Sequence, residues 1–262
     1  MTQVLSTHLY DAGLETAVNE LITQVIAPDL PDNRCVSATG AHGMITAMHE
    51  PDFRQVLDQF YWNLPDGMPG VWVGRLKGAT QMSRCYGPDF FKRVFEESAD
   101  KPVRHFLCGG KDGVADSLKT AVADKFGNHN VVGTFCPPFR TLTNDEFRAL
   151  GETINQSGAN VVWIGLSTPK QERFARQLAQ YTAVHFIVTV GAAFDFHTGN
   201  VRQAPAWMQR LSLEWFFRLL MEPKRLYKRY LEIVPLFIFY NLRELVTGSD
   251  NQRRIPHPLP LP

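Results

Sequence analysis

Two aspartates stand where a catalytic carboxylate could act. Asp66 lies in the turn sequence Pro-Asp-Gly, and Asp195 follows the apolar run at 184–194. At the carboxyl edge of a sheet, such a side chain faces the crevice where ligands bind. Each aspartate also has a simpler explanation, because Asp is common in turns and at helix N-caps. Neither residue decides the function alone.

The stretch "VVWIGLSTPKQERFARQL" (161–178) joins a strand to a helix. Its first four residues are apolar and predict a buried strand that ends at Gly165. Thr168 is expected as the N-cap of the following helix, and Pro169 as its first residue. Gln171 then opens the helix at the sheet edge where open α/β folds bind ligands.

Glycine and arginine residues add weaker candidates. In "LCGGKDGV", Gly109 lies at a strand-to-helix turn whose N–H groups could bind a phosphate. The same glycine could serve the turn alone. Arg84, in "SRCYGPDFF", and the basic residues near position 225 could equally be solvent-exposed charges.

Several common catalytic motifs are absent. The sequence has no Walker A motif and no Gly-x-Gly-x-x-Gly after a strand, which argues against an ATPase and a dinucleotide enzyme. It has no Asp-x-Asp, the pair with which many sugar-nucleotide enzymes hold a divalent ion. It also lacks Cys-x-x-Cys, His-Glu-x-x-His and Gly-x-Ser-x-Gly. We therefore expect no metal, no cofactor and no serine nucleophile.

Size and charge set broader limits. With 262 residues, 44% of them hydrophobic, the chain can bury a substantial core. Its net charge of +1 gives no overall attraction to nucleic acid. The N-terminus lacks a basic region followed by a long apolar core, so we expect no signal peptide and a cytosolic location.

The elements that would position these residues alternate along the chain. Helical patterns lie between apolar runs, and the helix expected from Thr143 opens with a Thr-x-x-Glu capping box. Alternating strands and helices predict an α/β fold, Rossmann-like, with a doubly wound, mainly parallel sheet. The expected buried strands are 33–39, 103–110, 130–135, 161–166 and 184–194.

The composition changes after Ala204. The segment that follows is expected to form helices broken at Pro223 and Pro235, and residues 205–246 hold seven Lys or Arg against four Glu, with many aromatic residues. We divide the chain into an α/β core (1–204), a helical, basic and aromatic appendage (205–246) and a Pro-rich tail expected to be disordered (247–262).

The appendage has two interpretations. Its longest apolar stretch, 233–240, is far shorter than the ~20 residues that span a bilayer. A basic, aromatic and amphipathic segment suits an anionic membrane surface. Apolar helix stripes also commonly pack on a protein core. The sequence leaves both interpretations open.

Taken in order, the motifs show a family resemblance. They are "PDGMP", "RCYGPDF", "FLCGG", "GTFCPPF", "IGLSTPKQE" and the long run from "VGAAFDFHTG" to "KRLYKRY". Together they closely resemble the WecG/TagA/CpsF glycosyltransferases, glycosyltransferase family 26, from about Asn33 to Tyr240. The most specific parts are Pro169–Glu172 and the Glu, Trp and Arg series at 214–230.

The resemblance implies an inverting, metal-independent enzyme. Such enzymes move a sugar from a UDP-sugar to a membrane-bound, polyprenyl-diphosphate-linked saccharide during assembly of bacterial surface polysaccharides. The expected partners are this donor, this acceptor and an anionic membrane surface, at the inner face of the cell membrane, with no nucleic acid. The donor sugar stays open among N-acetylmannosamine, its uronic acid, glucose and glucuronic acid. The acceptor glycan and the oligomeric state also stay open, a homo-oligomer included.

The resemblance also assigns roles to residues of this chain. Asp66 matches the family's proposed catalytic base, which would take a proton from the attacking acceptor hydroxyl. The family's pocket residues match Arg84, Gln171 and Asp195. The arginines thought to meet the diphosphates and the membrane match Arg210, Arg218, Arg225 and Arg229. Arginines would then neutralise the leaving diphosphate in place of a metal.

Under this resemblance, the stretch at 161–178 belongs to the donor site. Gly165 and Ser167 are expected to leave room for the nucleotide-sugar. The free N–H groups of the helix start are expected to face its phosphates or hydroxyls, and those near Gly109 could also meet a phosphate. Gln171 can hydrogen-bond the sugar.

One position departs from the family pattern. Many members carry Thr-x-Asn after the first strand, and the spacing places Ala38 and Gly40 there. Ser37, Thr39 or His42 could replace the lost donor contact, and Thr39 is included among the candidate binding residues. The difference could also mark a different donor sugar.

Two other functions stay open. A non-catalytic, membrane-associated α/β protein could sense a nucleotide-sugar or scaffold an assembly complex, and it would need no base at Asp66. A sugar-nucleotide modifying enzyme such as an epimerase would need a nicotinamide site or another acid–base pair. The sequence contains neither motif.

Overall fold

A computed structural model of the protein describes residues 1–27, 33–210 and 213–247. Within them lies a six-stranded sheet in which all neighbouring strands are parallel. Across the sheet the strands are β4 (Trp62–Pro65), β3 (Arg34–Thr39), β8 (Phe186–Thr189), β7 (Val161–Gly165), β5 (His105–Gly109) and β6 (Val131–Phe135). The predicted α/β fold with a parallel sheet is confirmed.

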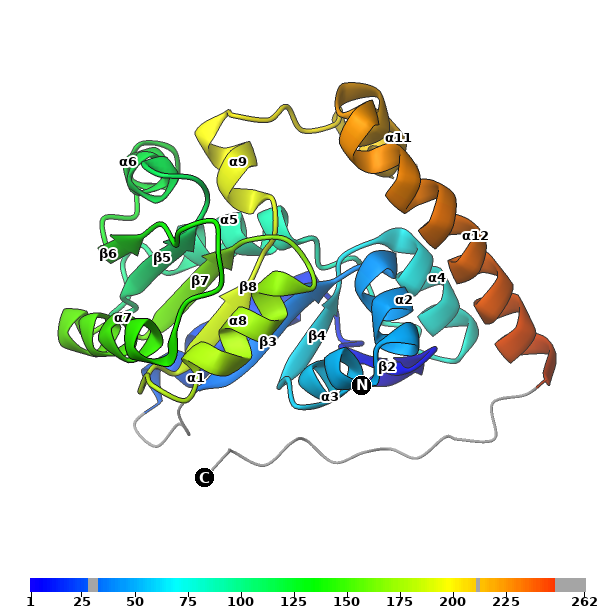
Figure 1. Ribbon diagram of the computed structural model, residues 1–262, viewed down its shortest axis with the longest axis horizontal. Coiled ribbons are helices and arrows are strands. Elements are labelled where there is room, and N and C mark those ends of the chain that lie inside the picture. Colours follow the sequence, from blue (N-terminus) through cyan, green and yellow to red (C-terminus); the bar gives the residue numbers. More distant parts are fainter. Residues whose placement is uncertain (28–32, 211–212, 248–262) are drawn as a thin grey trace.

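Helices cover both faces of the sheet (Figure 1). One face carries α1 (Leu14–Ile26), α5 (Gly87–Glu97), α6 (Val114–Phe126) and α9 (Ala193–Thr198), and the other carries α3 (Pro51–Asp58), α7 (Asn144–Ser157) and α8 (Lys170–Leu178). Trp163 and Val188 pack toward the first layer, and Val162 and Ile187 toward the second. A strand buried on both faces needs apolar residues at every position, which explains the continuous apolar runs.

The C-terminal segment forms α10 (Ala206–Arg210), α11 (Glu214–Met221) and α12 (Pro223–Thr247). The last of these lies against a small layer made of the antiparallel strands β1 (Thr2–Val4) and β2 (Thr7–Leu9) with α2 (Ala41–His49) and α4 (Met68–Leu76) (Figure 1). Ile233 and Phe237 are buried in this layer, and Lys77 forms a 2.7 Å ion pair with Glu244. One face of α12 is therefore core.

The opposite face of α12 is exposed and largely apolar. Its exposed apolar side chains include Tyr227, Leu231, Ile238, Phe239, Leu242 and Val246. The sequence leaves two interpretations of this segment open, and one of them is packing on the protein core. That interpretation explains the buried face of α12 but not its exposed apolar face. In the described ranges, no helix combines the length and the apolar character needed to cross a membrane.

Three strand assignments differ from the prediction. The sequence does not predict β4, because a four-residue strand containing Asn63 and Pro65 looks like part of the following turn. The hairpin of β1 and β2 is also missed, since each strand has three residues. The run at 184–194 is not one strand: β8 ends at Thr189, and Gly191, with φ of 57°, turns the chain toward α9.

The start of α8 also differs from the prediction. The helix begins at Lys170, so Pro169 occupies the N-cap position instead of the first helical position. Thr168 is not the cap: its peptide bond to Pro169 is cis, and its hydroxyl donates to the Glu172 carboxylate at 2.8 Å. The capping box that begins at Thr143 is confirmed.

Pro235 lies inside α12 without ending it, so the predicted break there is wrong. Proline removes the hydrogen bond to the carbonyl four residues earlier, here that of Leu231. Leu231 is on the exposed face, where water can bond the freed carbonyl. The predicted break at Pro223 is confirmed, since α12 begins there.

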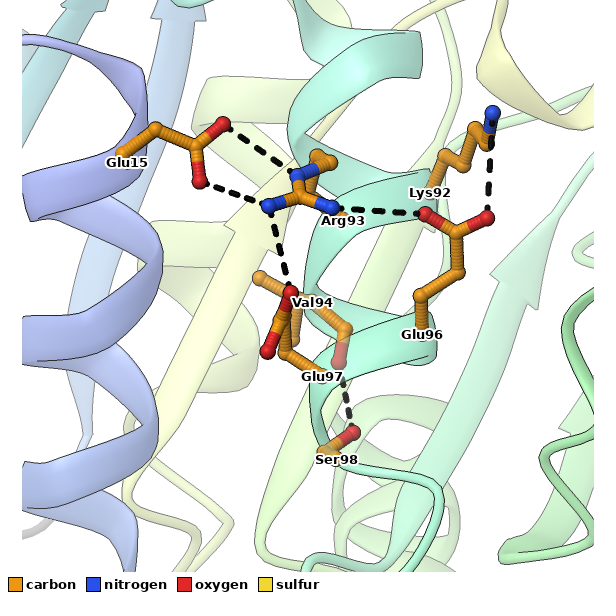
Figure 2. Close-up of polar contacts among 7 residues, drawn as sticks. All are labelled: Glu15, Lys92, Arg93, Val94, Glu96, Glu97 and Ser98. Carbon is orange, nitrogen blue, oxygen red and sulfur yellow. Dashed lines mark hydrogen bonds and ion pairs between the residues drawn. The ribbon is translucent and has the colours of Figure 1, made fainter.

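Charged side chains tie α5 to α1. Arg93 donates from Nε and Nη2 to the carboxylate of Glu15, at 3.2 and 2.7 Å (Figure 2). It also pairs with Glu97, one turn further along α5, at 3.1 Å. Exposed pairs of this kind add little to stability. The buried Phe91 and Val94 therefore do most to position α5, which follows the loop that carries Arg84.

A buried histidine links α5 to the start of β5. The Nδ1 atom of His105 accepts from Trp163 Nε1 at 3.2 Å, and its Nε2 atom lies 3.1 Å from Ser98 Oγ. Ser98 donates its own proton to the carbonyl of Val94, so Nε2–H of His105 is the donor to Ser98. Burial lowers the pKa of His105 to about 3. The imidazole is therefore neutral in the folded protein.

We expect His105 to make the fold less stable in mild acid. Its pKa is about 6.5 in the unfolded chain and about 3 in the folded protein. The contribution of the neutral His105 to the free energy of unfolding is therefore complete above pH 6.5 and is lost as the pH falls toward 3. Between pH 7 and pH 5 this loss is about 2 kcal/mol. Urea unfolding of the wild type and of His105→Gln at pH 7 and pH 5 measures this loss of stability. An equal loss in both proteins would contradict the prediction.

Candidate functional site

Most predicted site residues gather at the carboxyl edge of the sheet. Thr39 ends β3, Gly109 ends β5, and Asp66 directly follows β4. Gln171 lies in the first turn of α8, after β7, and Asp195 lies in α9, after β8. All strands of a parallel sheet end at the same edge, which is why residues far apart in the sequence meet there.

Backbone hydrogen bonds hold Asp66 at the tip of β4. Its N–H donates to the carbonyl of Thr39 at 3.2 Å, and its Oδ1 accepts from the N–H of Gly87 at 2.8 Å. A Cβ at Gly40 would lie 3.6 Å from Asp66 Oδ2, so the glycine leaves space beside that oxygen. The side chain is half-buried. Asp66 thus has Oδ1 held by the Gly87 N–H, while Oδ2 lies on the side of Gly40.

The surroundings of Asp66 favour its protonated form more than water does. Burial raises the pKa of Asp66 to about 6, against the opposing effects of the Gly87 N–H and of Arg84. Glu214 raises this pKa further, and Arg218 lowers it. A carboxylate with a pKa near 6 is mostly ionised at neutral pH and still binds a proton readily. These properties suit a general base.

The side chain of Arg84 is fixed by residues of the C-terminal segment. Its Nη2 forms a 2.8 Å ion pair with Glu214, and its Nη1 donates to the carbonyl of Gln209 at 3.4 Å. The guanidinium lies 4.1 Å from the ring centre of Tyr86. The Nε atom is buried without a hydrogen-bond partner among the described residues. An anionic ligand would satisfy this N–H.

Arg218, on α11, brings a second guanidinium to the site. It lies 5.7 Å from the ring centre of Phe196 on α9, and its charge acts on Asp66. Its Nε is also buried and has no hydrogen-bond partner in the part of the chain that the structure describes. Two guanidiniums with unpartnered N–H groups near one carboxylate can bind an anion beside a base.

Two residues of this site are missing from the sequence predictions. Tyr86 is buried, and its hydroxyl donates to Glu214, the carboxylate that also binds Arg84. Both residues stand within motifs that carry the family resemblance, "RCYGPDF" and "LSLEWFF", so a signal was present. The contact itself has no signal in the sequence, because Tyr86 and Glu214 are 128 positions apart.

Two predicted contacts with the donor are engaged inside the protein. The hydroxyl of Thr39 is buried and donates to Ser37 at 3.0 Å. Gln171 is buried as well: its Oε1 accepts from the N–H of Gly191 at 3.0 Å, and its Nε2 donates to Glu172 at 2.9 Å. A sugar would have to replace one of these partners. The binding roles of Thr39 and Gln171 stay predictions.

The two glycines at the strand ends serve close packing. A Cβ at Gly109, whose φ is 150°, would lie 2.6 Å from the carbonyl oxygen of Gly165 on the neighbouring strand. A Cβ at Gly165 would lie 2.4 Å from the ring of Phe194. The expectation that Gly165 leaves room for a ligand is therefore wrong, since Phe194 fills that space. A phosphate contact at Gly109 stays a prediction.

Four predicted residues remain: Asp195, Arg210, Arg225 and Arg229. Asp195 is half-buried on α9. Arg229, on α12, lies near His42 of α2, whose pKa is lowered to about 4 by burial and by the charge of Arg229. Arg210 and Arg225 belong to α10 and α12, but their side chains lie outside the described part of the structure. The roles of these four residues stay predictions.

Comparisons with known proteins give a match over almost the whole chain. A model of the "Glycosyl transferase WecG/TagA/CpsF family" matches residues 2–251. The chain is also similar to the N-acetylglucosaminyldiphosphoundecaprenol N-acetyl-beta-D-mannosaminyltransferase of Bacillus subtilis (strain 168). The two are 30% identical over 209 residues, which cover 80% of this chain and 79% of the relative. The family match spans the sheet and the C-terminal helices, and these are the two parts of the chain that supply residues of the candidate site.

Proposed function

The chain belongs to the WecG/TagA/CpsF family of glycosyl transferases, and on this premise we propose that it transfers a sugar from a UDP-sugar to a polyprenyl-diphosphate-linked saccharide. The observation that carries the proposal is the grouping of Asp66, with its raised pKa, with the guanidiniums of Arg84 and Arg218. A base beside two cations suits the attack of a neutral hydroxyl on a substrate whose leaving group is an anion.

In the proposed reaction, the acceptor hydroxyl attacks the anomeric carbon from the side opposite the diphosphate, which inverts its configuration. Asp66 accepts the hydroxyl proton as the new glycosidic bond forms. The bond to the diphosphate breaks, and UDP leaves with additional negative charge. Arg84 and Arg218 stabilise that charge with N–H groups that have no partner among the described residues.

The acceptor class is proposed from the named relative. That relative transfers N-acetylmannosamine to N-acetylglucosaminyldiphosphoundecaprenol, as its name states. A saccharide carried by a polyprenyl diphosphate is held at a membrane. We therefore place the reaction at the inner face of the cell membrane, in the assembly of a bacterial surface polysaccharide. N-acetylmannosamine, its uronic acid, glucose and glucuronic acid are the candidate donor sugars.

The C-terminal segment 205–246 has a surface that fits a membrane role. Leu231 and Phe239 are exposed on α12, and Lys224 and Lys228 are exposed near its start. An apolar face beside cationic side chains is typical of a helix that lies in the interface of an anionic bilayer. In this proposal the segment holds Asp66 over the acceptor, and the core before it binds the nucleotide-sugar.

The proposed activity is tested with purified protein, a panel of UDP-sugars and polyprenyl-diphosphate-linked N-acetylglucosamine in detergent. Formation of a lipid-linked disaccharide with inverted anomeric configuration is the expected result. Binding of a UDP-sugar with neither transfer nor slow hydrolysis would instead favour a non-catalytic sensor or scaffold.

We expect transfer to continue in excess EDTA. The sequence has no Asp-x-Asp pair, and in the described ranges no group of three or more His, Cys, Asp or Glu side chains is placed to hold a metal ion. Arginine side chains, which are permanently charged, would supply the positive charge instead. The measurement is the initial rate with and without the chelator. Loss of activity that Mg²⁺ or Mn²⁺ restores would overturn this account of charge neutralisation.

A further inference from the structure

Glu214 joins the C-terminal helices to the loop between α4 and α5. Its side chain is mostly buried, at 12% exposure, and so is that of Arg84, at 15%. Oε2 of Glu214 accepts from Arg84 Nη2 at 2.8 Å, and Oε1 accepts from the hydroxyl of Tyr86. Each carboxylate oxygen therefore holds one side chain of the same loop.

The backbone at the end of this loop and at Gly87, the first residue of α5, is in turn bonded to the tip of β4 and to Asp66. The N–H of Cys85 donates to the carbonyl of the last residue of β4 at 2.9 Å. The N–H of Gly87 donates to Asp66 Oδ1 at 2.8 Å. The side chains of the loop thus contact Glu214 while its backbone contacts the proposed base. A shift of Glu214 would disturb both.

Arg84 has few other restraints. Besides Glu214, it has a 3.4 Å contact with the carbonyl of Gln209 and the ring of Tyr86 beneath it. Its buried Nε has no partner among the described residues. The ion pair with Glu214 is therefore the main contact that sets the orientation of the guanidinium.

We propose that Glu214 is a positioning residue of the transferase, which holds Arg84 and Tyr86 so that the Nε edge of Arg84 faces the leaving diphosphate beside Asp66. This inference rests on the proposed function. Glu214 does not touch the substrate and acts through Arg84.

Two physical effects of Glu214 on the rate of transfer oppose each other. Its negative charge offsets that of Arg84, so electrostatics alone predict faster transfer without it. Loss of orientation predicts slower transfer, and the proposal commits to the second effect.

The test is the kinetics of Glu214→Ala and Glu214→Gln. Misplacing a group that stabilises the transition state costs on the order of 10²-fold in rate, so Glu214→Ala should lose about that much in kcat. Glu214→Gln keeps the size and one acceptor oxygen and should recover part of the loss. The matched control is Glu152→Gln, an exposed carboxylate on α7, which should retain the wild-type rate. Thermal unfolding of each variant separates loss of folding from loss of rate.

A double-mutant cycle with Arg84 identifies the route of the effect. If Glu214 acts through Arg84, then Glu214→Ala should slow the Arg84→Ala protein little further.

The pH profile of kcat/KM gives a second readout. Glu214 raises the pKa of Asp66, which also faces Arg84, Arg218 and the Gly87 N–H. Glu214→Gln should therefore move the acid limb of kcat/KM to lower pH, which a residue that only stabilises the fold would not do.

The outcomes separate this inference from the proposed function. If the wild type transfers no sugar, the proposed function itself fails. If the wild type transfers sugar and Glu214→Ala is equally fast or faster, the positioning role alone is wrong. The same holds if the losses of Glu214→Ala and Arg84→Ala simply add.

Discussion

Replacing Asp66 by Asn is expected to lower the rate of sugar transfer by on the order of 10²–10⁴-fold, the usual effect of losing a general base. Asn keeps the size of the side chain and an oxygen that can accept the Gly87 N–H. It cannot accept the proton of the attacking hydroxyl. Binding of the UDP-sugar should change little, because the base acts on the acceptor. The measurements are kcat and the Kd of the UDP-sugar, by calorimetry.

A matched control for this variant is Asp58→Asn. Asp58 is an exposed carboxylate at the end of α3, just before β4, whereas Asp66 follows the other end of that strand. The control should keep the wild-type rate. If the Asp66→Asn protein also transferred sugar at a near-normal rate, Asp66 would only form the turn. The non-catalytic alternative, a sensor or scaffold, would then be favoured.

The pH dependence of the wild type reports on the same side chain. The base must be ionised to accept a proton, so kcat/KM should fall as the pH drops below about 6, the pKa that burial gives Asp66. The residual activity of Asp66→Asn should lack this limb. A limb that persisted in the variant would have to belong to another group.

The sheet could be predicted where the sequence carries long apolar runs. β5 and β7 are buried on both faces, so every residue of each strand had to suit a core. β4 could not be predicted, because Pro65 and Asp66 look like a turn. The boundary between β8 and α9 was not predicted, because both elements are apolar and their hydrophobic patterns merge.

The candidate site could be predicted in part, and for a physical reason. Asp195 is a candidate because it follows an apolar run at an expected strand end, whereas Asp66 is chosen because it matches the family's proposed base. The burial of Gln171 was not predictable, because its partners at Gly191 and Glu172 depend on how α8 packs. Nor was the bond from Tyr86 to Glu214, which joins two segments whose patterns are local.

The C-terminal helix shows a similar limit. Its apolar residues cover more than one face, and no pattern says which face meets protein. Ile233 and Phe237 are buried with Met44 of α2, while Leu231 and Phe239 are exposed. A truncation at Ala204 would therefore uncover the apolar side of α2, and its loss of activity would have two explanations. Changing exposed charges avoids this difficulty.

Reversing Lys224 and Lys228 to Glu is expected to weaken binding to anionic vesicles by on the order of 10³-fold. Each cationic side chain near an anionic leaflet contributes about 1 kcal/mol, and the double reversal changes the local charge by four units, so the loss is about 4 kcal/mol. Both lysines are exposed at the start of α12, beside its apolar face. Rising salt should weaken wild-type binding too, because these charges act through water. Co-sedimentation with vesicles across a salt series measures both effects.

The matched control reverses Lys119 and Arg148, which are exposed on α6 and α7, far from α12 (Figure 1). It changes the net charge by the same amount, so equal weakening would mean that total charge, and not the face of α12, decides binding. Folding should survive the reversal at 224 and 228, because the buried side of α12 is untouched. If neither that reversal nor salt changes the bound fraction, the lysines do not meet an anionic leaflet. The exposed apolar face of α12 would then have to be covered by protein instead of lipid.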